Sequence, residues 1–210
     1  YNPLTFERNE RPGVDAVYGR AGIGDLGQAE LAWAPQDRWV NHSLLTRGRA
    51  NWKGWDGSVL GGKISGSTGS FLLGGDFAGD LFEGTLHGEA GWFNPETRTP
   101  YWKTGLGYDY SFKNESTILV EGYHAGNGRP GFSQNYMGAV YTKDLTPLLT
   151  LEAVGIANVD DGSTFFMPSL TWNALTDLHL TAAMQRFGGE RRTEYGRVPN
   201  STILTAQYWF

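Results

Sequence analysis

The charged side chains of this chain recur at every second position of short segments, so each set falls on one face of an extended strand. Arg47, Arg49 and Lys53 share such a face in segment 43–53, opposite an apolar face. The same alternation assigns further residues to polar faces of other segments: Glu30, Glu89, Lys103, Asp109, Glu121, Glu152 and His179. We interpret all of these as candidate pore-lining residues. A basic wall facing an acidic wall would create a transverse field that orders polar solutes and sets an ion preference.

A serine–histidine pair is the second kind of chemistry that the sequence offers. Ser163 and Ser169 lie in the segment before that of His179, and two adjacent strands could present a nucleophile and its base. However, no Gly-x-Ser-x-Gly segment is present. His179 also alternates with an apolar face, so its side chain points inward. We therefore expect such polar pairs to form hydrogen bonds inside a barrel, and we do not expect an enzyme.

No cofactor and no metal site is expected. Cysteine is absent, which excludes thiolate ligands. His87 together with Glu89 and Glu121 could be viewed as a metal cluster, but spacing along strands constrains ligand geometry only weakly. The glycine-rich stretch at 20–27 (RAGIGDLG) is followed neither by a helix nor by a Lys-Ser/Thr pair, so it does not predict a phosphate-binding loop.

The elements that position these residues are strands, because periodicity of two recurs along the chain and long helical periodicity is missing. The expected strands are 14–23, 26–34, 43–53, 56–66, 69–77, 82–93, 101–112, 116–125, 135–144, 148–158, 163–173, 178–188 and 200–210. This pattern predicts an all-β fold, an antiparallel transmembrane β-barrel that forms a single domain over residues 1–210. Bacterial single-chain barrels normally have an even number of strands, so we expect about 12, with about 14 as the next choice.

The N-terminal segment 1–13 affects the expected number of strands, because it could supply an extra strand or lie inside the barrel.

The connections between the expected strands alternate in length, as they do in outer-membrane barrels. Short turns are expected at 113–115, 143–147 and 173–177. Longer connections are expected at 94–100, 126–133 and 188–200, and a tight turn at 160–162 interrupts this trend.

Composition and the positions of the aromatic residues favour a membrane location. The chain has 30 Gly, 8 Trp and 10 Tyr, which is typical of many strands and turns with rings at the interfaces. Aromatic residues gather near the ends of the expected strands, and the last strand ends on Phe210. No apolar run reaches the roughly 18 residues of a transmembrane helix. The net charge is −5 without a basic patch, so nucleic acid is not an expected partner.

Several segments together resemble a family of uncharacterised bacterial outer-membrane β-barrel proteins of porin-like type. They are residues 11–16 (RPGVDA), 76–80 (DFAGD), 119–126 (LVEGYHAG) and 194–197 (EYGR), the last followed by a terminal aromatic strand. The resemblance extends from about residue 9 to the end of the chain. The resemblance implies an outer-membrane barrel. The motifs on which the resemblance rests do not themselves indicate a catalytic or ligand-binding role.

The sequence departs from that family at its start. Members normally have more strands before the segment that corresponds to residues 2–6 (NPLTF), and here that segment begins at the second residue. A truncated or engineered barrel would explain the difference. The departure at the start of the chain therefore determines neither barrel closure nor strand number.

The expected function is passive diffusion of small polar solutes or ions through a porin-like channel in the bacterial outer membrane. The alternative is a closed structural or binding barrel whose loops at 94–100, 126–134 and 188–200 bind a partner. A lipid hydrolase is the third reading. The expected partners are the lipid bilayer and lipopolysaccharide, which Arg191, Arg192 and Arg197 could contact; a solvated charged loop is the alternative interpretation of those arginines.

Overall fold

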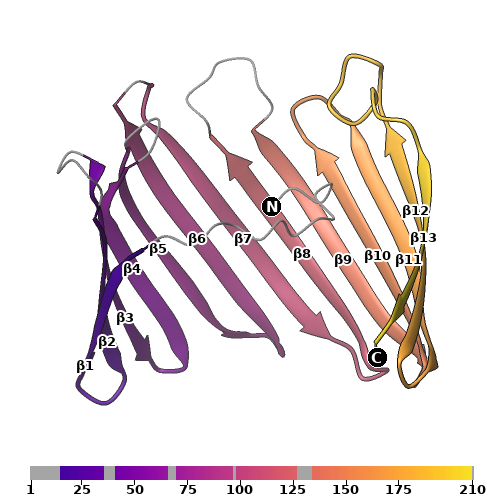
Figure 1. Cartoon of the computed structure of the whole chain (residues 1–210), viewed down its shortest axis with the longest axis horizontal. Helices are drawn as coiled ribbons and strands as arrows, with labels where there is room; N and C mark the ends of the chain where they lie inside the picture. Colours follow the sequence, from indigo (N-terminus) through magenta and orange to yellow (C-terminus); the bar gives the residue numbers. More distant parts are fainter. Residues whose placement is uncertain (1–14, 36–40, 66–69, 97, 127–133, 210) are drawn as a thin grey trace.

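One antiparallel sheet contains every strand in the computed structural model, which describes residues 15–35, 41–65, 70–96, 98–126 and 134–209. The strands follow one another in chain order across the sheet (Figure 1). They are β1 (Val17–Ile23), β2 (Gly27–Ala34), β3 (Ser43–Trp52), β4 (Trp55–Ile64), β5 (Ser70–Leu81), β6 (Gly84–Pro95), β7 (Tyr101–Ser111), β8 (Ser116–Ala125), β9 (Asn135–Thr146), β10 (Leu149–Asn158), β11 (Thr164–Leu175), β12 (Leu178–Gly188) and β13 (Ser201–Tyr208). The predicted all-β antiparallel, barrel-like fold is confirmed.

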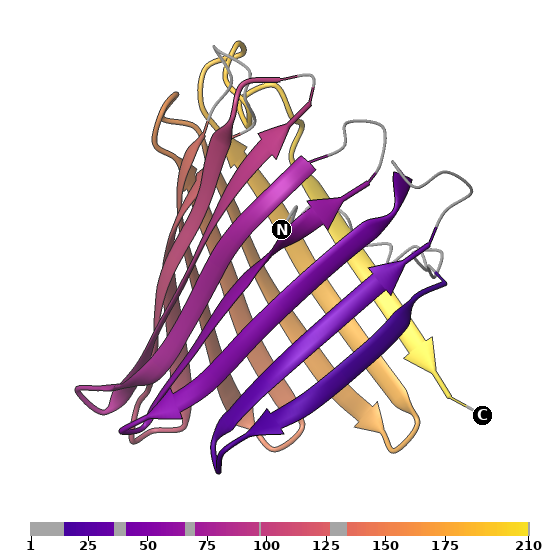
Figure 2. The ribbon, with the colours of Figure 1, turned by 90° about the vertical axis from the view of Figure 1, so that its left-hand side faces the viewer.

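The strand number differs from the expected even value, because the described residues form 13 strands. Each of the predicted segments from 14–23 onward corresponds to one of them. Within the described residues, β1 pairs only with β2 and β13 only with β12, so the sheet is curled but not closed (Figures 1 and 2). Because the strands alternate in direction, these two edge strands run the same way. The predicted extra strand within 1–13 lies outside the described residues.

Connections of two kinds alternate along the sheet, as predicted. Those at 24–26, 53–54, 82–83, 112–115, 147–148 and 176–177 are short, and Figure 2 shows short turns gathered at one end of the sheet. The connections after the even-numbered strands, such as 159–163 and 189–200, are longer. In the turn at 53–54, Lys53 and Gly54 have φ values of 51° and 84°. Positive φ at both central residues is the requirement of a type I′ hairpin turn.

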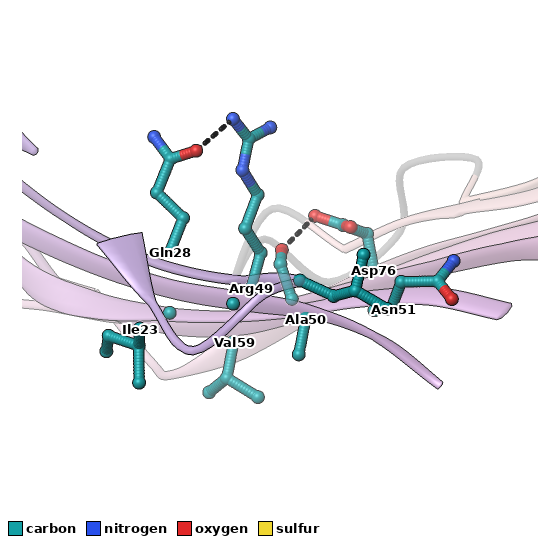
Figure 3. A pocket seen from close by; sticks show the side chains of 12 residues that line it. Ile23, Gln28, Arg49, Ala50, Asn51, Val59 and Asp76 are labelled. Carbon is teal, nitrogen blue, oxygen red and sulfur yellow. Dashed lines mark hydrogen bonds between the residues drawn. The ribbon is translucent and has the colours of Figure 1, made fainter. Parts of the chain in front are cut away.

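The two faces of the sheet differ in chemistry. Large apolar side chains that are exposed on strands fall almost entirely on one face, as at Leu31, Val59, Leu106, Phe166 and Leu204. Residues that alternate with them form the polar face. Figure 3 shows this division, with Gln28, Arg49 and Asp76 on one side of the ribbon and Ile23, Ala50 and Val59 on the other. The alternation predicted from the sequence is therefore present, and the apolar side chains are exposed on one face of the sheet.

Glycines make room for aromatic rings on the apolar face, which accounts for part of the high glycine content. A Cβ atom at Gly79 would collide with the ring of Trp55 on the neighbouring strand. At Gly88 it would lie 2.7 Å from the ring of Phe77. Rings can thus lie flat across adjacent strands where a larger residue would push them away.

Candidate functional site

A continuous band of directly opposed residues crosses the polar face from β2 to β10. Its members are Gln28, Arg49, Ser58, Asp76, Glu89, Gly105, Tyr123, Tyr136 and Asn158. Each residue faces the next across one pair of strands, and every member except Gly105 has a polar group. Only the pairing register brings these residues into one row, because they come from nine separate strands.

Arg47 forms an ion pair at the edge of the polar band. Its Nη2 lies 2.9 Å from Asp76 Oδ2, and its Nε donates to Ser58 Oγ at 2.9 Å. The Ser58 hydroxyl in turn donates to the same Asp76 oxygen at 2.5 Å. Arg47 on β3 thus reaches Asp76 on β5 across β4, a contact that fits the concave side of a curled sheet. Both partners are more than one-third exposed, so solvent screening keeps the contribution of this pair to stability small.

Arg49 is also paired with acidic and polar groups. Its Nη2 lies 3.4 Å from Glu30 Oε1 and donates to Gln28 Oε1 at 2.8 Å. Gln28 Nε2 donates to Glu30 Oε1 at 3.0 Å, which completes a small network. The predicted wall of separate basic groups is therefore largely neutralised in this region, because both arginines lie against carboxylates. The sequence analysis did not identify Asp76 as the partner of Arg47.

The two lysines predicted for the basic wall lie elsewhere. Lys53 is in the turn after β3, one residue beyond the strand, and its Nζ is 5.0 Å from the centroid of the Trp52 ring. Lys103 is on β7, where its Nζ lies 5.5 Å from the centroid of Phe93. Neither lysine joins Arg47 and Arg49, so the structure does not bring the four predicted basic residues together as one wall.

The predicted acidic residues lie on the polar face of β2, β6, β7, β8 and β10. Glu89 faces Gly105, and Glu121 faces Gly107 and Gly138, so glycine stands across from both carboxylates. Glu152 faces Ser169 and Thr142. In the part of the chain that the structure describes, no ion pair engages Glu89, Glu121 or Glu152. The unneutralised charge on this face is thus predominantly negative.

His87 contacts Asp109, another predicted acidic residue. The two side chains approach to 3.1 Å between Nε2 and Oδ2, without the geometry of a hydrogen bond. A search of the described residues finds no group of three or more histidine or acidic side chains that could hold a metal ion. His87, Glu89 and Glu121 therefore do not converge on one point.

The candidate nucleophile and base are not neighbours. Ser169 pairs with Ala183 on β12, four residues from His179, which corresponds to about 13 Å along a strand. His179 instead faces Asn173 and Gln207, and its ring packs edge-on against Trp209 with 4.4 Å between centroids. Ser163 is fully buried and donates to Asp161. The geometry thus places both serines outside reach of this histidine.

The connection after β12 is anchored to the polar face by Glu194, which sequence reasoning missed. Its Oε2 accepts hydrogen bonds from Tyr136 Oη at 2.9 Å and Asn158 Nδ2 at 2.7 Å. Its backbone N donates to Asp161 Oδ2 at 2.7 Å. One residue of this charged segment therefore joins β9, β10 and the turn at 159–163.

Tyr195 provides the apolar half of the same anchor. It is 5% exposed and packs against Phe165 and Phe187, with ring centroids 6.2 and 6.4 Å away. Its backbone N donates to Ser163 Oγ at 3.2 Å. Burial, together with the nearby charges of Glu194 and Asp161, raises the pKa of Tyr195 to about 12. We define residues 189–200 as the anchored loop.

Two aspartates stabilise the turn that receives the anchored loop. Asp160 accepts hydrogen bonds from the Asn135 side chain and from the backbone N of Gln134 and Asn135, and these lower its pKa. Burial alone would raise the pKa of Asp161. Hydrogen bonds from Ser163 and from the Glu194 backbone outweigh that effect, so its pKa also lies below the ordinary value. Both carboxylates are therefore held in their charged form.

These lowered pKa values predict that the loop contact survives mild acid. A carboxylate with a depressed folded-state pKa stabilises the fold above its ordinary pKa of 3.8, and this contribution is lost as pH falls through the lowered value. We expect the amide NMR shifts of Gln134 and Glu194 to stay constant down to about pH 4 and to change only below it. Asp161→Asn should abolish the pH-dependent change in the amide shift of Glu194 and should leave the change at Gln134 in place. A midpoint above about pH 4 at either amide would contradict the assignment.

The fold and the polar band define a class: a meandering antiparallel sheet that is curled in a barrel-like way and has one exposed apolar face and one polar face. The structure has no helix that is both long and apolar enough to cross a membrane among its described residues. Comparison with protein-family models found no match to this chain. A search of curated proteins found no match either. The resemblance to outer-membrane barrel proteins stays a prediction.

Proposed function

We propose that this chain forms the wall of a transmembrane β-barrel in a bacterial outer membrane and serves the passive diffusion of small polar solutes or ions. The observation that carries this proposal is the exposed apolar face of the sheet. Trp52, Leu106 and Leu204 are 71%, 56% and 79% exposed. Contiguous apolar surface of this extent is unusual on a soluble monomer. A bilayer would cover it, while the polar face would line an aqueous interior.

The dimensions and connections of the sheet support the same proposal. Most strands have 10 to 12 residues, from β3 with 10 to β11 with 12. A tilted strand needs about 9–11 residues to cross the hydrocarbon core. Short turns at one end and longer connections at the other are the asymmetry of outer-membrane barrels, in which the short turns face the periplasm.

Cations are the solutes that the charge distribution favours. Arg47 and Arg49 lie against carboxylates, whereas Glu89 and Glu121 have no ion pair within the described chain. Rings of acidic side chains are the usual basis of cation preference in channels. An interior with its arginines neutralised and several carboxylates free would admit small cations more readily than anions.

Single-channel recording in a planar bilayer tests this function. We expect stepwise conductance of reproducible size and, under a salt gradient, a reversal potential of the sign that indicates cation preference. Glu89→Gln with Glu121→Gln should shift the reversal potential toward zero, because both charges lie on the polar face. The matched control is Glu115→Gln, which removes an exposed charge in a short turn and should leave the potential unchanged. Insertion without conductance would contradict the proposed channel.

The anchored loop favours a second candidate function, a closed barrel that binds a partner. Glu194 and Tyr195 hold this loop against the polar face, so it covers part of one end of the sheet. Such a segment could narrow the passage and present its outer residues to another molecule. The same recording separates the two candidates, because a closed barrel would insert without conducting. The lipid hydrolase reading is not proposed, since Ser169 and His179 lie apart.

A further inference from the structure

Four arginines gather at the end of β12 and in the anchored loop: Arg186, Arg191, Arg192 and Arg197. All four are exposed. Of the two acidic residues in this stretch, Glu194 is already engaged by Tyr136 and Asn158. None of the ion pairs found among the described residues involves these arginines. The guanidinium groups of these four arginines are therefore available to an anionic ligand.

Two successive turns present the loop arginines to solvent. In the first, Thr193 N donates to Glu190 O at 2.9 Å, which places Arg191 and Arg192 at the two central positions. In the second, Val198 N donates to Tyr195 O at 3.0 Å, with Arg197 at a central position. The anchor formed by Glu194 and Tyr195 lies between the two turns and points inward. The arginines consequently occupy the outward corners of a segment with fixed conformation.

Gly196 brings the two turns against each other. A Cβ atom at this position would collide with the carbonyl oxygen of Glu190 and with the backbone of Gly189. The backbone around Glu190 and the backbone at Gly196 are therefore in contact. Arg191 and Arg197 directly follow these two positions, so the contact brings arginines of both turns to one part of the rim.

The fourth arginine connects this rim to the apolar face. Arg186 pairs with Phe166, which is 49% exposed on that face. Farther along the same strands, Leu170, Ala182 and Leu204 face one another in one row, and Trp172, Leu180 and Ala206 in the next. These residues line a shallow groove of about 430 Å³. Ala182 is four residues from Arg186, which places the groove about 13 Å from the arginine along the strand.

We propose that this part of the protein binds an anionic, phosphate-bearing membrane lipid. The arginines hold its headgroup, since guanidinium groups bind phosphate oxygens through paired hydrogen bonds. One acyl chain lies in the groove beside Trp172, where a separation of about 13 Å fits a chain that descends from the headgroup into the bilayer. The site rests on the proposed membrane location, because the groove lies on the face that the bilayer would cover. A solvated loop would require neither the groove nor the alignment of Arg186 with it.

Quenching of Trp172 fluorescence by lipids with brominated chains tests the site. The protein is placed in mixed micelles that contain either brominated phosphatidylglycerol or brominated phosphatidylcholine, and the signal of a Trp172→Phe variant is subtracted. We expect the anionic lipid to quench at lower mole fraction than the zwitterionic lipid. Each Arg→Gln change at positions 186, 191, 192 and 197 should weaken apparent binding of the anionic lipid by about fivefold or less. Quenching by the zwitterionic lipid should stay the same.

The matched control removes two cations at the opposite rim, with Lys53→Gln and Lys113→Gln, and should leave the lipid preference unchanged. Equal quenching by the two lipids would overturn the site while leaving the membrane proposal standing. The proposed lipid site would also be overturned if the preference for the anionic lipid survived all four arginine changes. Loss of that preference in the lysine variant would overturn it as well. Quenching by neither lipid would overturn both the site and the proposed membrane location.

Discussion

Leu106→Arg should destabilise the protein by about 2–4 kcal/mol in lipid vesicles, the cost of an arginine on the lipid face near the bilayer midplane. Leu106 lies in the middle of β7, is 56% exposed and faces Gly88 and Gly122 on the adjacent strands. On a soluble protein, the same change at so exposed a position would alter the free energy of unfolding by about 0.5 kcal/mol or less. The substitution therefore distinguishes a lipid-covered face from a solvated one.

Reversible unfolding of the vesicle-inserted protein in urea would measure the difference. Phe112→Arg is the matched control, because Phe112 lies on the same face directly after β7 and near the rim. An arginine at that depth should cost about 0–1 kcal/mol. Equal, small effects at both positions would refute the bilayer-facing assignment, whereas a large effect at Leu106 alone would establish the depth dependence of a membrane face.

The faces of the strands were predictable because side-chain direction in a strand depends only on sequence parity. Trp102 and Leu106 had to share a face, and Lys103 and Asp109 the other, as the structure has them. The even strand number was not predictable in the same way. That rule describes closed barrels, and in the described residues β1 and β13 have no partner on their outer edges.

To predict the side-chain contacts of the candidate site, one must know which residues pair across neighbouring strands. Alternation of polar and apolar residues within one strand does not give this pairing register. Arg47 meets Asp76 only because the pairing of β3 with β4 and of β4 with β5 brings both residues close to Ser58. Lys53 does not lie on the strand with Arg47 and Arg49. Gly54 favours a two-residue turn, and Lys53 is the first residue of that turn. Charge counting along separate strands therefore overestimated the free positive charge of the polar face.

The anchored loop shows a further limit of local pattern. Its arginines and glutamates predicted a solvated segment, and most of them are exposed. The signal for burial was a single aromatic residue, Tyr195, followed by a glycine that permits close packing of the two turns. One buried ring among many charges has no periodicity, so only the tertiary contacts with Phe165 and Phe187 reveal the anchor.

Tyr195→Ala should release the anchored loop. Removal of a buried aromatic side chain costs about 3–5 kcal/mol where the contact is part of the folded core. Because the loop leaves the sheet at β12 and returns at β13, we expect this cost to appear as local opening with the strands intact. Trypsin reports the opening directly, since Arg191, Arg192 and Arg197 lie in the loop. Cleavage at these sites should become faster by about 100-fold or more.

Tyr195→Phe is the control that separates the packing of the ring from any contribution of the hydroxyl group. It keeps the ring between Phe165 and Phe187, so trypsin resistance should stay close to that of the parent. Glu194→Gln should give an intermediate rate, because an amide oxygen can still accept a hydrogen bond from Asn158 but without a charge. If Tyr195→Ala left the cleavage rate unchanged, Tyr195 would not be the anchor. The inward contacts, which keep the two arginine turns together, would then have to depend on Glu194 alone.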